Sequence, residues 1–341
     1  MTTPVVERVP PRAPRGPLLS VQDLHIRFAT EDGPVHAVNG VSFDLAAGEI
    51  VALVGESGCG KSVTAMSVPG LLPPTATVTG RVLLDGQNLL ELSPKQLRAV
   101  RGKQVSFVFQ EPMSSLNPAF TVGKQIREVL QRHEGMSKKA AHARAVELLR
   151  LVRIPAPERR VDEYPHQLSG GMRQRVMIAI AVACGPQVLV ADEPTTALDV
   201  TIQAGVLDIL RDLRDQLGTA IILITHDLGV VADLADRVVV MYAGRPVEQA
   251  EVHELFAHPQ HPYTNGLLGA VPHREQGVEL VAGRRLREIP GLVPSLRSDP
   301  DECVFAPRCP RSTEVCVSHR PPFEPTRPHH LAACFHPGED A

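Results

Sequence analysis

The sequence predicts an α/β protein with a mostly parallel sheet, a helical insertion and a small C-terminal extension rich in proline and cysteine. Short apolar runs alternate with stretches whose apolar residues recur at helical spacing, the pattern of strands and helices packed in layers. One apolar run leads directly into a glycine-rich turn and then into a helix. Four of the six cysteines follow residue 300.

The composition is that of an ordinary globular chain of 341 residues, 43% hydrophobic and 21% charged. A net charge of −3, three tyrosines and no tryptophan argue against a nucleic-acid partner, which selects basic patches and stacking aromatics. No uninterrupted apolar run reaches about 18 residues, so no membrane-spanning helix is expected. Residues 1–17 are rich in Pro and Arg and lack a secretory signal's apolar region, so we expect a disordered lead and a cytosolic protein.

The elements follow in a regular order from Leu18. A helix is expected from Lys61 to about Leu72. Residues 122–152 have helical spacing with a break near Gly135 and predict the helical insertion. Apolar runs predict strands at 18–28, 41–45, 49–55, 105–110, 188–193, 220–227 and 237–244.

The stretch GESGCGKS, residues 55–62, matches the phosphate-binding spacing G-x-x-x-x-G-K-[ST] between a strand and a helix. Its glycines let the backbone curl so that successive N–H groups face the phosphates. Lys61 would reach the β- and γ-phosphates, and Ser62 would ligate Mg²⁺. The other residues expected to contact the nucleotide here are Gly55, Ser57, Gly58, Cys59, Gly60 and Val63.

The stretch VLVADEP, residues 188–194, is an apolar strand that ends in two acids. Two acids are by themselves a common strand end. After a P-loop, however, Asp192 is placed to bind Mg²⁺ through water, and Glu193 to polarise the attacking water as a general base. The pair therefore predicts nucleotide hydrolysis.

A second anion cradle is predicted at LSGGMRQR, residues 168–175. Ser169, Gly170 and Gly171 open a helix, and a helix N-terminus favours negative charge. One nucleotide needs one such cradle, which the P-loop already supplies. We therefore expect the second cradle to serve a nucleotide held by another subunit.

These motifs resemble, in their order, those of the ATP-binding-cassette ATPases. Gln110 in VFQEP matches the Q-loop, LSGGMRQR the signature, TALD (196–199) the D-loop and His226 in ITHD the switch histidine. The resemblance implies a RecA-like core with an antiparallel β subdomain. It also implies a head-to-tail dimer that sandwiches ATP between one subunit's P-loop and the other's signature.

The resemblance also implies roles for single residues. Phe28 would stack on adenine, although a core phenylalanine is the alternative, and Asp199 of the D-loop would contribute to nucleotide binding. Gln110 would sense Mg²⁺ and the attacking water, and His226 would contact the γ-phosphate. Val63 replaces a hydroxyl common at this position, while Ser62 keeps the essential oxygen. The catalytic set is complete and predicts ATP hydrolysis: Glu193, His226, Gln110 and Lys61.

The single P-loop and the lack of a membrane domain or coiled coil distinguish the chain from exporters, translation factors and DNA-repair members of the family. FQEPMSSLNP (109–118), HPYTNGLLGAVP (261–272) and PRCP (307–310) resemble the dipeptide, oligopeptide and nickel uptake branch. This resemblance runs from Leu18 to His336. It implies a peripheral ATPase on the cytoplasmic face of the plasma (inner) membrane that powers di- and oligopeptide import.

The implied partners are two permease subunits docking after Gln110, a second similar or identical ATPase subunit and an extracytoplasmic substrate-binding protein. Import of nickel or another small solute stays open, as does a soluble nucleic-acid-remodelling ATPase with a zinc module. The expected divisions are the lead at 1–17, a nucleotide-binding domain at 18–265 with a helical subdomain at about 112–168, and the extension at 266–341.

The last four cysteines, Cys303, Cys309, Cys316 and Cys334, have the spacing C-x5-C-x6-C-x17-C. A disulfide is disfavoured in the cytosol, and the close pairs of structural zinc sites are missing. Nearby histidines keep a mixed zinc site open, four thiolates suit an iron–sulfur cluster, and unligated thiols are a further alternative.

In the peptide-uptake ATPases that this chain resembles, such an extension is associated with a [4Fe–4S] cluster. The resemblance therefore makes a cluster on these four cysteines the prediction, with zinc as the runner-up. We expect it to be structural, so that its loss disorders the extension and leaves the nucleotide site intact. Cys59 and Cys184 are expected to be unrelated to it.

Overall fold

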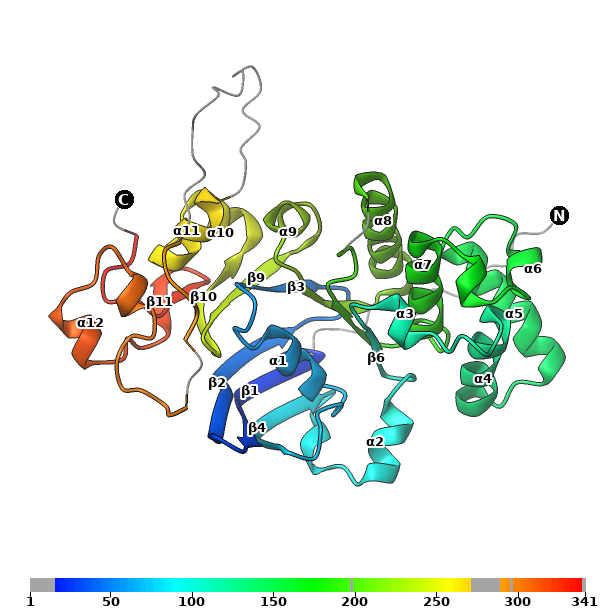
Figure 1. Cartoon of the computed structure of the whole chain (residues 1–341), viewed down its shortest axis with the longest axis horizontal. Coiled ribbons are helices and arrows are strands. Elements are labelled where there is room, and N and C mark those ends of the chain that lie inside the picture. The colour runs from blue at the N-terminus through cyan, green and yellow to red at the C-terminus, as the bar shows by residue number, and fades with distance from the viewer. Residues whose placement is uncertain (1–15, 197–198, 271–288, 295–296, 339–341) are drawn as a thin grey trace, which may run out of the picture.

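Two sheets and a group of helices organise the chain (Figure 1). The computed structural model describes residues 16–196, 199–270, 289–294 and 297–338. Within them, one sheet has the strand order β11-β12-β10-β9-β3-β8-β7-β6 and the other the order β2-β1-β4-β5. Parts of the predicted lead and extension, at 1–15, 271–288, 295–296 and 339–341, lie outside the described residues.

The centre of the larger sheet is parallel. Strand β3 lies between β8 and β9, and β7 lies between β8 and β6. All residues of β3, β7 and β8 are buried, as their unbroken apolar sequences predict. The predicted α/β class is confirmed. The five strands are β3 (Ile50–Val54), β6 (Val105–Val108), β7 (Val188–Asp192), β8 (Ala220–Ile224) and β9 (Arg237–Tyr242).

The smaller sheet is antiparallel and consists of β1 (Leu19–Thr30), β2 (Gly33–Leu45), β4 (Ala76–Leu84) and β5 (Gln87–Asn88). Helix α1 (Lys61–Ser67) contacts strands of both sheets. The prediction that this helix reaches about Leu72 is wrong. It stops early because Pro69 has no N–H to donate and Gly70 adopts a left-handed φ of 65°.

The helical insertion lies at the end of the larger sheet where β6 forms the edge (Figure 1). Gly135 ends α4 with a left-handed φ of 64°, and Ser137 caps α5, which confirms the predicted break. Helices α8 (Val200–Leu217) and α9 (Leu228–Leu234) follow along the same sheet, and α2 (Pro94–Val100) precedes β6. The insertion contains α3 (Pro112–Ser115), α4 (Val122–Glu134), α5 (Lys138–Leu151), α6 (Pro157–Arg160) and α7 (Gly170–Ala181).

The C-terminal extension continues the larger sheet at its opposite edge (Figure 1). β10 pairs antiparallel with β9, and β12 and β11 are added in turn. Within the described residues, every helix is too short or too polar to span a bilayer. β10 (Arg245–Glu251), α10 (Val252–Ala257) and α11 (Pro262–Gly269) lead into the extension. Its further elements are a 3₁₀ turn (Ala306–Arg308), α12 (Glu314–Ser318), β11 (Glu324–Arg327) and β12 (His330–Ala332).

A buried carboxylate fastens this extension to the sheet. Glu248 of β10 accepts hydrogen bonds from the backbone N–H groups of Gln260 (2.7 Å) and His261 (2.9 Å). His330 of β12 places its Nε2 2.6 Å from the same carboxylate, and both side chains are fully buried. The extension is therefore built onto the main sheet and does not stand apart from it.

Candidate nucleotide site

The loop after β3 has a shape that only glycine allows at two positions. Gly55 has a φ of 145°, and a Cβ there would lie 2.2 Å from the carbonyl oxygen of Met241. Gly60 has a φ of 95°, and its Cβ would lie 2.4 Å from the carbonyl oxygen of Ala37. Ser57 and Gly58 form the exposed tip of this loop. The predicted P-loop thus has the tight curl that its spacing requires.

Lys61 is buried within the loop that it follows. Its Nζ donates to the carbonyl oxygens of Gly55 (2.8 Å) and Glu56 (2.9 Å) and lies 3.6 Å from the Cys59 sulfur. Here the carbonyl dipoles stabilise the charge of the Lys61 ammonium group. Anionic phosphate oxygens bind an ammonium group more strongly than neutral carbonyl oxygens do. Burial raises the pKa of the Cys59 thiol, so this cysteine stays protonated and packs as an apolar side chain.

Two oxygen groups far apart in sequence meet beside the loop. The Ser62 hydroxyl donates to the Asp192 carboxylate at 3.0 Å. Burial raises the pKa of Asp192, while Ser62 and Lys61 act in the opposite direction. A hydroxyl and a carboxylate are oxygen donors of the kind that Mg²⁺ takes. The residues predicted to hold Mg²⁺ therefore fit that ion.

The carboxylate of Glu193 connects three further side chains. It accepts hydrogen bonds from Gln110 Nε2 and Thr196 Oγ1, both at 2.8 Å, and lies 3.1 Å from His226 Nδ1. Burial alone would raise the pKa of Glu193, but the hydrogen bonds of His226 and Thr196 lower it. The carboxylate is therefore ionised at neutral pH and able to accept a proton.

The structure thus brings together Gln110, Glu193 and His226, three of the residues expected to be catalytic, and adds Thr196, which the sequence analysis missed. The available signal was its position three residues after Glu193 in the DEPTT stretch, where a hydroxyl can hydrogen-bond back to a residue at the end of a strand.

The signature residues lie apart from this group. Ser169 caps α7 through its hydroxyl, which accepts from the Met172 N–H at 3.4 Å. A Cβ on Gly171 would lie 2.3 Å from Ile202, so α7 and α8 are packed too closely there for a larger residue. Helix α7 packs on the other helices of the insertion, on α8 and on β6, and lies away from α1 (Figure 1).

Three other predicted residues lie outside the group around Glu193. Asp199 caps α8 by accepting from the Ile202 N–H at 2.9 Å, while 197–198 of the D-loop lie outside the described residues. Phe28 of β1 is half-buried and pairs with Val35 and Ala76 on the neighbouring strands. Val63 is half-buried on α1.

The four C-terminal cysteines line one small, largely enclosed cavity: Cys303, Cys309, Cys316 and Cys334. All six cysteines of the chain are free thiols. Burial raises the pKa of Cys303 to about 11, and it also raises that of Cys309 and Cys334. Among the described residues, however, no group of three or more His, Cys, Asp or Glu side chains is arranged to hold a metal ion. The structure thus shows the four cysteines meeting at one cavity. It gives no further support to the predicted cluster or to its zinc alternative.

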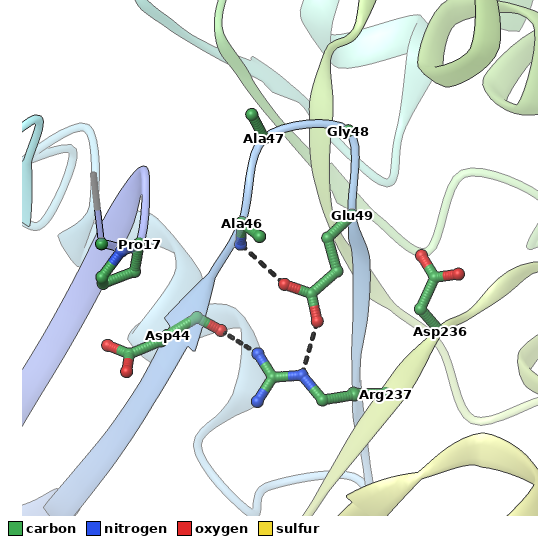
Figure 2. Close-up of a pocket in the computed structure, with 9 residues that line it drawn as sticks. Pro17, Asp44, Ala46, Ala47, Gly48, Glu49, Asp236 and Arg237 are labelled. Atoms are coloured by element: carbon green, nitrogen blue, oxygen red, sulfur yellow. Dashed lines mark hydrogen bonds and ion pairs between the residues drawn. The ribbon is translucent and has the colours of Figure 1, made fainter. Parts of the chain in front are cut away.

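A surface depression of about 560 Å³ lies elsewhere, beside the turn between β2 and β3 (Figure 2). Glu49 accepts from the Ala46 N–H and pairs with Arg237, which also donates to the Asp44 carbonyl. None of the predicted nucleotide-binding residues lines it. Glu49 neutralises Arg237 there, so the arginine offers no uncompensated positive charge to a phosphate. The depression is therefore not suited to a nucleotide.

Two family models match the chain. One, described as ABC transporter, covers residues 38–196. The other, described as the C-terminal region of oligopeptide/dipeptide transporters, covers residues 247–316. The first range includes the P-loop, Gln110, the signature and Glu193 but not His226, and the second includes much of the extension.

Curated relatives match over nearly their whole length. A probable peptide ABC transporter ATP-binding protein of Sinorhizobium fredii is 54% identical over 94% of this chain and 96% of its own. The dipeptide transport ATP-binding protein DppD of Bacillus subtilis is 54% identical over 88% of each chain. The oligopeptide transport ATP-binding protein OppD of Salmonella typhimurium is 48% identical over 96% of each.

Solved structures agree with these relatives. The ATP-binding cassette MJ0796, determined as a dimer bound to ADP and phosphate, aligns with a TM-score of 0.62 and 28% identity, over 69% of this chain and 98% of its own. The cbiO1 subunit of a Clostridium perfringens ABC transporter complex aligns at 0.60 and 30% identity, over 71% and 91%. This chain belongs to the ABC transporter family, as an ATP-hydrolysing subunit that carries the oligopeptide/dipeptide type of C-terminal region.

Proposed function

We propose that this chain is the motor subunit of an importer for dipeptides or oligopeptides. The observation that carries the cargo class is the C-terminal region, which matches that of oligopeptide/dipeptide transporters. Relatives named for dipeptide and oligopeptide transport, with similarity along almost the entire chain, support the same class.

The site geometry supports a separate role for each of its residues. The P-loop N–H groups and Lys61 would bind the phosphates, with Ser62 and Asp192 holding Mg²⁺. Bound Mg²⁺ would neutralise charge on the β- and γ-phosphates. Glu193 would accept a proton from the attacking water, while Gln110 and His226 orient that water and the γ-phosphate.

The second cradle fits a head-to-tail dimer. Ser169, Gly170, Gly171 and Asp199 would complete the site of a second ATPase subunit, since α7 lies away from the P-loop of its own chain. Phe28 would stack on adenine.

Two permease subunits would dock beside Gln110, and a substrate-binding protein would deliver cargo from outside. The chain would thus sit peripherally on the cytoplasmic face of the membrane, with 18–265 as its nucleotide-binding domain.

Within the extension at 266–341 we place a [4Fe–4S] cluster on the four cysteines. Their convergence on one cavity supports it. Cluster ligation needs thiolates, and buried thiols with raised pKa values would release protons on loading. Iron and sulfide analysis after anaerobic purification tests the placement. About four of each per chain is expected, whereas protein that holds zinc or no metal contradicts it.

The function is tested by transport. The chain is reconstituted with its permease and partner ATPase in proteoliposomes and supplied with binding protein and labelled di- or tripeptides. We expect ATP-dependent peptide uptake that stops with Glu193→Gln in this chain, while Glu251→Gln, an exposed control, transports normally. Uptake of nickel alone would assign the nickel role, and ATPase activity that requires DNA instead of the permease would contradict import.

A further inference from the structure

The C-terminal extension contacts the P-loop directly through one ion pair. Arg308 donates from Nη1 to Glu56 Oε2 at 2.7 Å and from Nη2 to Glu56 Oε1 at 3.1 Å. Glu56 is the second residue of the P-loop, and Arg308 immediately precedes Cys309. Two residues 252 positions apart thus join the nucleotide site to the four-cysteine region.

Arg308 is held in a fixed orientation. It is only 8% exposed, and besides Glu56 it donates to the Pro290 carbonyl (2.7 Å), the Ile289 carbonyl (3.0 Å) and the Tyr242 hydroxyl (3.3 Å). These five contacts match the five N–H donors of a guanidinium. A lysine at this position carries the charge but lacks the planar fork that binds a carboxylate through two bonds.

Glu56 is in turn held at three points. Its N–H donates to the hydroxyl of the buried Tyr263 at 2.8 Å, and its carbonyl accepts from Lys61. Its carboxylate is neutralised by Arg308. Without Arg308, an unpaired carboxylate would stand beside the loop that must bind a triphosphate, and like charges repel most where water is partly excluded.

The turn that carries Arg308 also lines the cysteine cavity. Cys303 and Cys309 line that cavity, while Phe305 between them packs against Tyr242 and Tyr263, with ring centres 5.1 Å and 5.4 Å apart. Arg308 itself lies over the Tyr242 ring. A change in the packing of the cavity therefore reaches Glu56 through a single short turn.

We propose that Arg308 is a positioning residue for the P-loop, so that the four-cysteine region and the nucleotide site are energetically coupled. An ordered region holds and neutralises Glu56 for ATP binding, and bound ATP stabilises the region in return, because such coupling is reciprocal. The proposal rests on the proposed role of the P-loop in ATP binding. It departs from the expectation that loss of the cysteine site leaves the nucleotide site intact.

The test uses the full chain and measures its equilibrium affinity for Mg-ATP by calorimetry. We expect Arg308→Ala to raise the dissociation constant about tenfold, which corresponds to about 1.4 kcal/mol. The matched control is Arg327→Ala, which removes another arginine of the extension that pairs with the main domain, at Glu254. It should change the affinity by less than twofold. Wild-type protein that binds no ATP would contradict the proposed function itself.

A second substitution separates charge neutralisation from general destabilisation. Glu56→Gln added to Arg308→Ala removes the unpaired carboxylate, so the double variant should bind ATP more tightly than Arg308→Ala alone. A purely structural role for Arg308 predicts no such recovery. Should Arg308→Ala fail to fold, Arg308→Gln in the same pairing with Glu56→Gln gives the comparison, because glutamine removes the charge and keeps more of the side chain.

Steady-state ATPase kinetics give an independent readout. Because the pair acts on ATP binding, Arg308→Ala should raise the KM for ATP and change kcat by less than twofold. An unchanged affinity for Arg308→Ala, matching Arg327→Ala, would overturn the proposal. So would a double variant no tighter than Arg308→Ala, or a loss confined to kcat.

Discussion

The catalytic group and the junction of the extension are built in opposite ways. Around Glu193, half-buried and exposed side chains hold one another by hydrogen bonds. At the junction, Glu248, His330 and Arg308 are buried, and main-chain groups satisfy half of their hydrogen bonds. The first arrangement can change its partners during a reaction cycle, whereas the second fixes one geometry. Substitutions in the two regions should therefore change different measured quantities.

The largest expected effect is on the rate of hydrolysis. Glu193→Gln removes the proposed base, so we expect kcat for ATP to fall by about a hundredfold or more. The free energy of unfolding should change by less than about 0.5 kcal/mol, because the amide keeps most of the hydrogen bonds at a partly exposed position. Paired ATPase and urea-unfolding measurements test this. A normal rate, or a large loss of stability, would remove Glu193 from its proposed role.

The next largest effect is on stability. Glu248→Ala leaves two backbone N–H groups and His330 without their buried acceptor, so the free energy of unfolding should fall by about 3 kcal/mol. Thermal and urea unfolding test this loss, with Glu251→Ala on the same strand as the exposed control. Equal stabilities of the two variants would show that this carboxylate does not fasten the extension.

The half-buried thiol of Cys303 should respond to pH in a defined direction. Burial raises the pKa of Cys303 from 9.0 to about 11, so the folded state keeps its proton where the unfolded chain loses it. In metal-free protein, the contribution of Cys303 to the free energy of unfolding is therefore fully present below about pH 9. It is lost as the pH rises towards 11. Maleimide labelling of Cys303 at pH 7.5 should be about a hundredfold slower than in urea. Equal rates would contradict the burial of this thiol.

The smallest effect is expected at the exposed edge of the junction. Arg327 pairs with Glu254 at 3.1 Å, with its side chain 44% exposed. Such pairs contribute little because solvent screens them, so Arg327→Ala should cost less than about 0.5 kcal/mol. Urea unfolding measures this, and a loss as large as that of Glu248→Ala would show that burial does not distinguish the two contacts.

The two regions also differ in how far the sequence predicts them. The residues that bind the phosphates are consecutive in the sequence, so the P-loop could be recognised directly. Ser62 and Asp192 were each assigned to Mg²⁺ from their motifs, and the structure places their side chains 3.0 Å apart. Helix α1 was predicted too long because apolar spacing outweighed the Pro69–Gly70 break.

The junction was not predictable in the same way. β11 and β12 are only four and three residues long, and β12 pairs with the edge that β10 offers. The contact of Arg308 with Glu56 joins positions 252 residues apart, and no local pattern marks either residue. The meeting of the four cysteines was expected from a resemblance, whereas their short connection to the P-loop became visible only in three dimensions.

The coupling of these regions is tested most directly by amide hydrogen exchange of the wild-type full chain with and without Mg-ATP. We expect ATP to slow exchange in the P-loop and also in residues 303–309, with little change in β11 (Glu324–Arg327) at the far edge of the extension. Slower exchange in the P-loop alone, with residues 303–309 unchanged, would contradict the coupling.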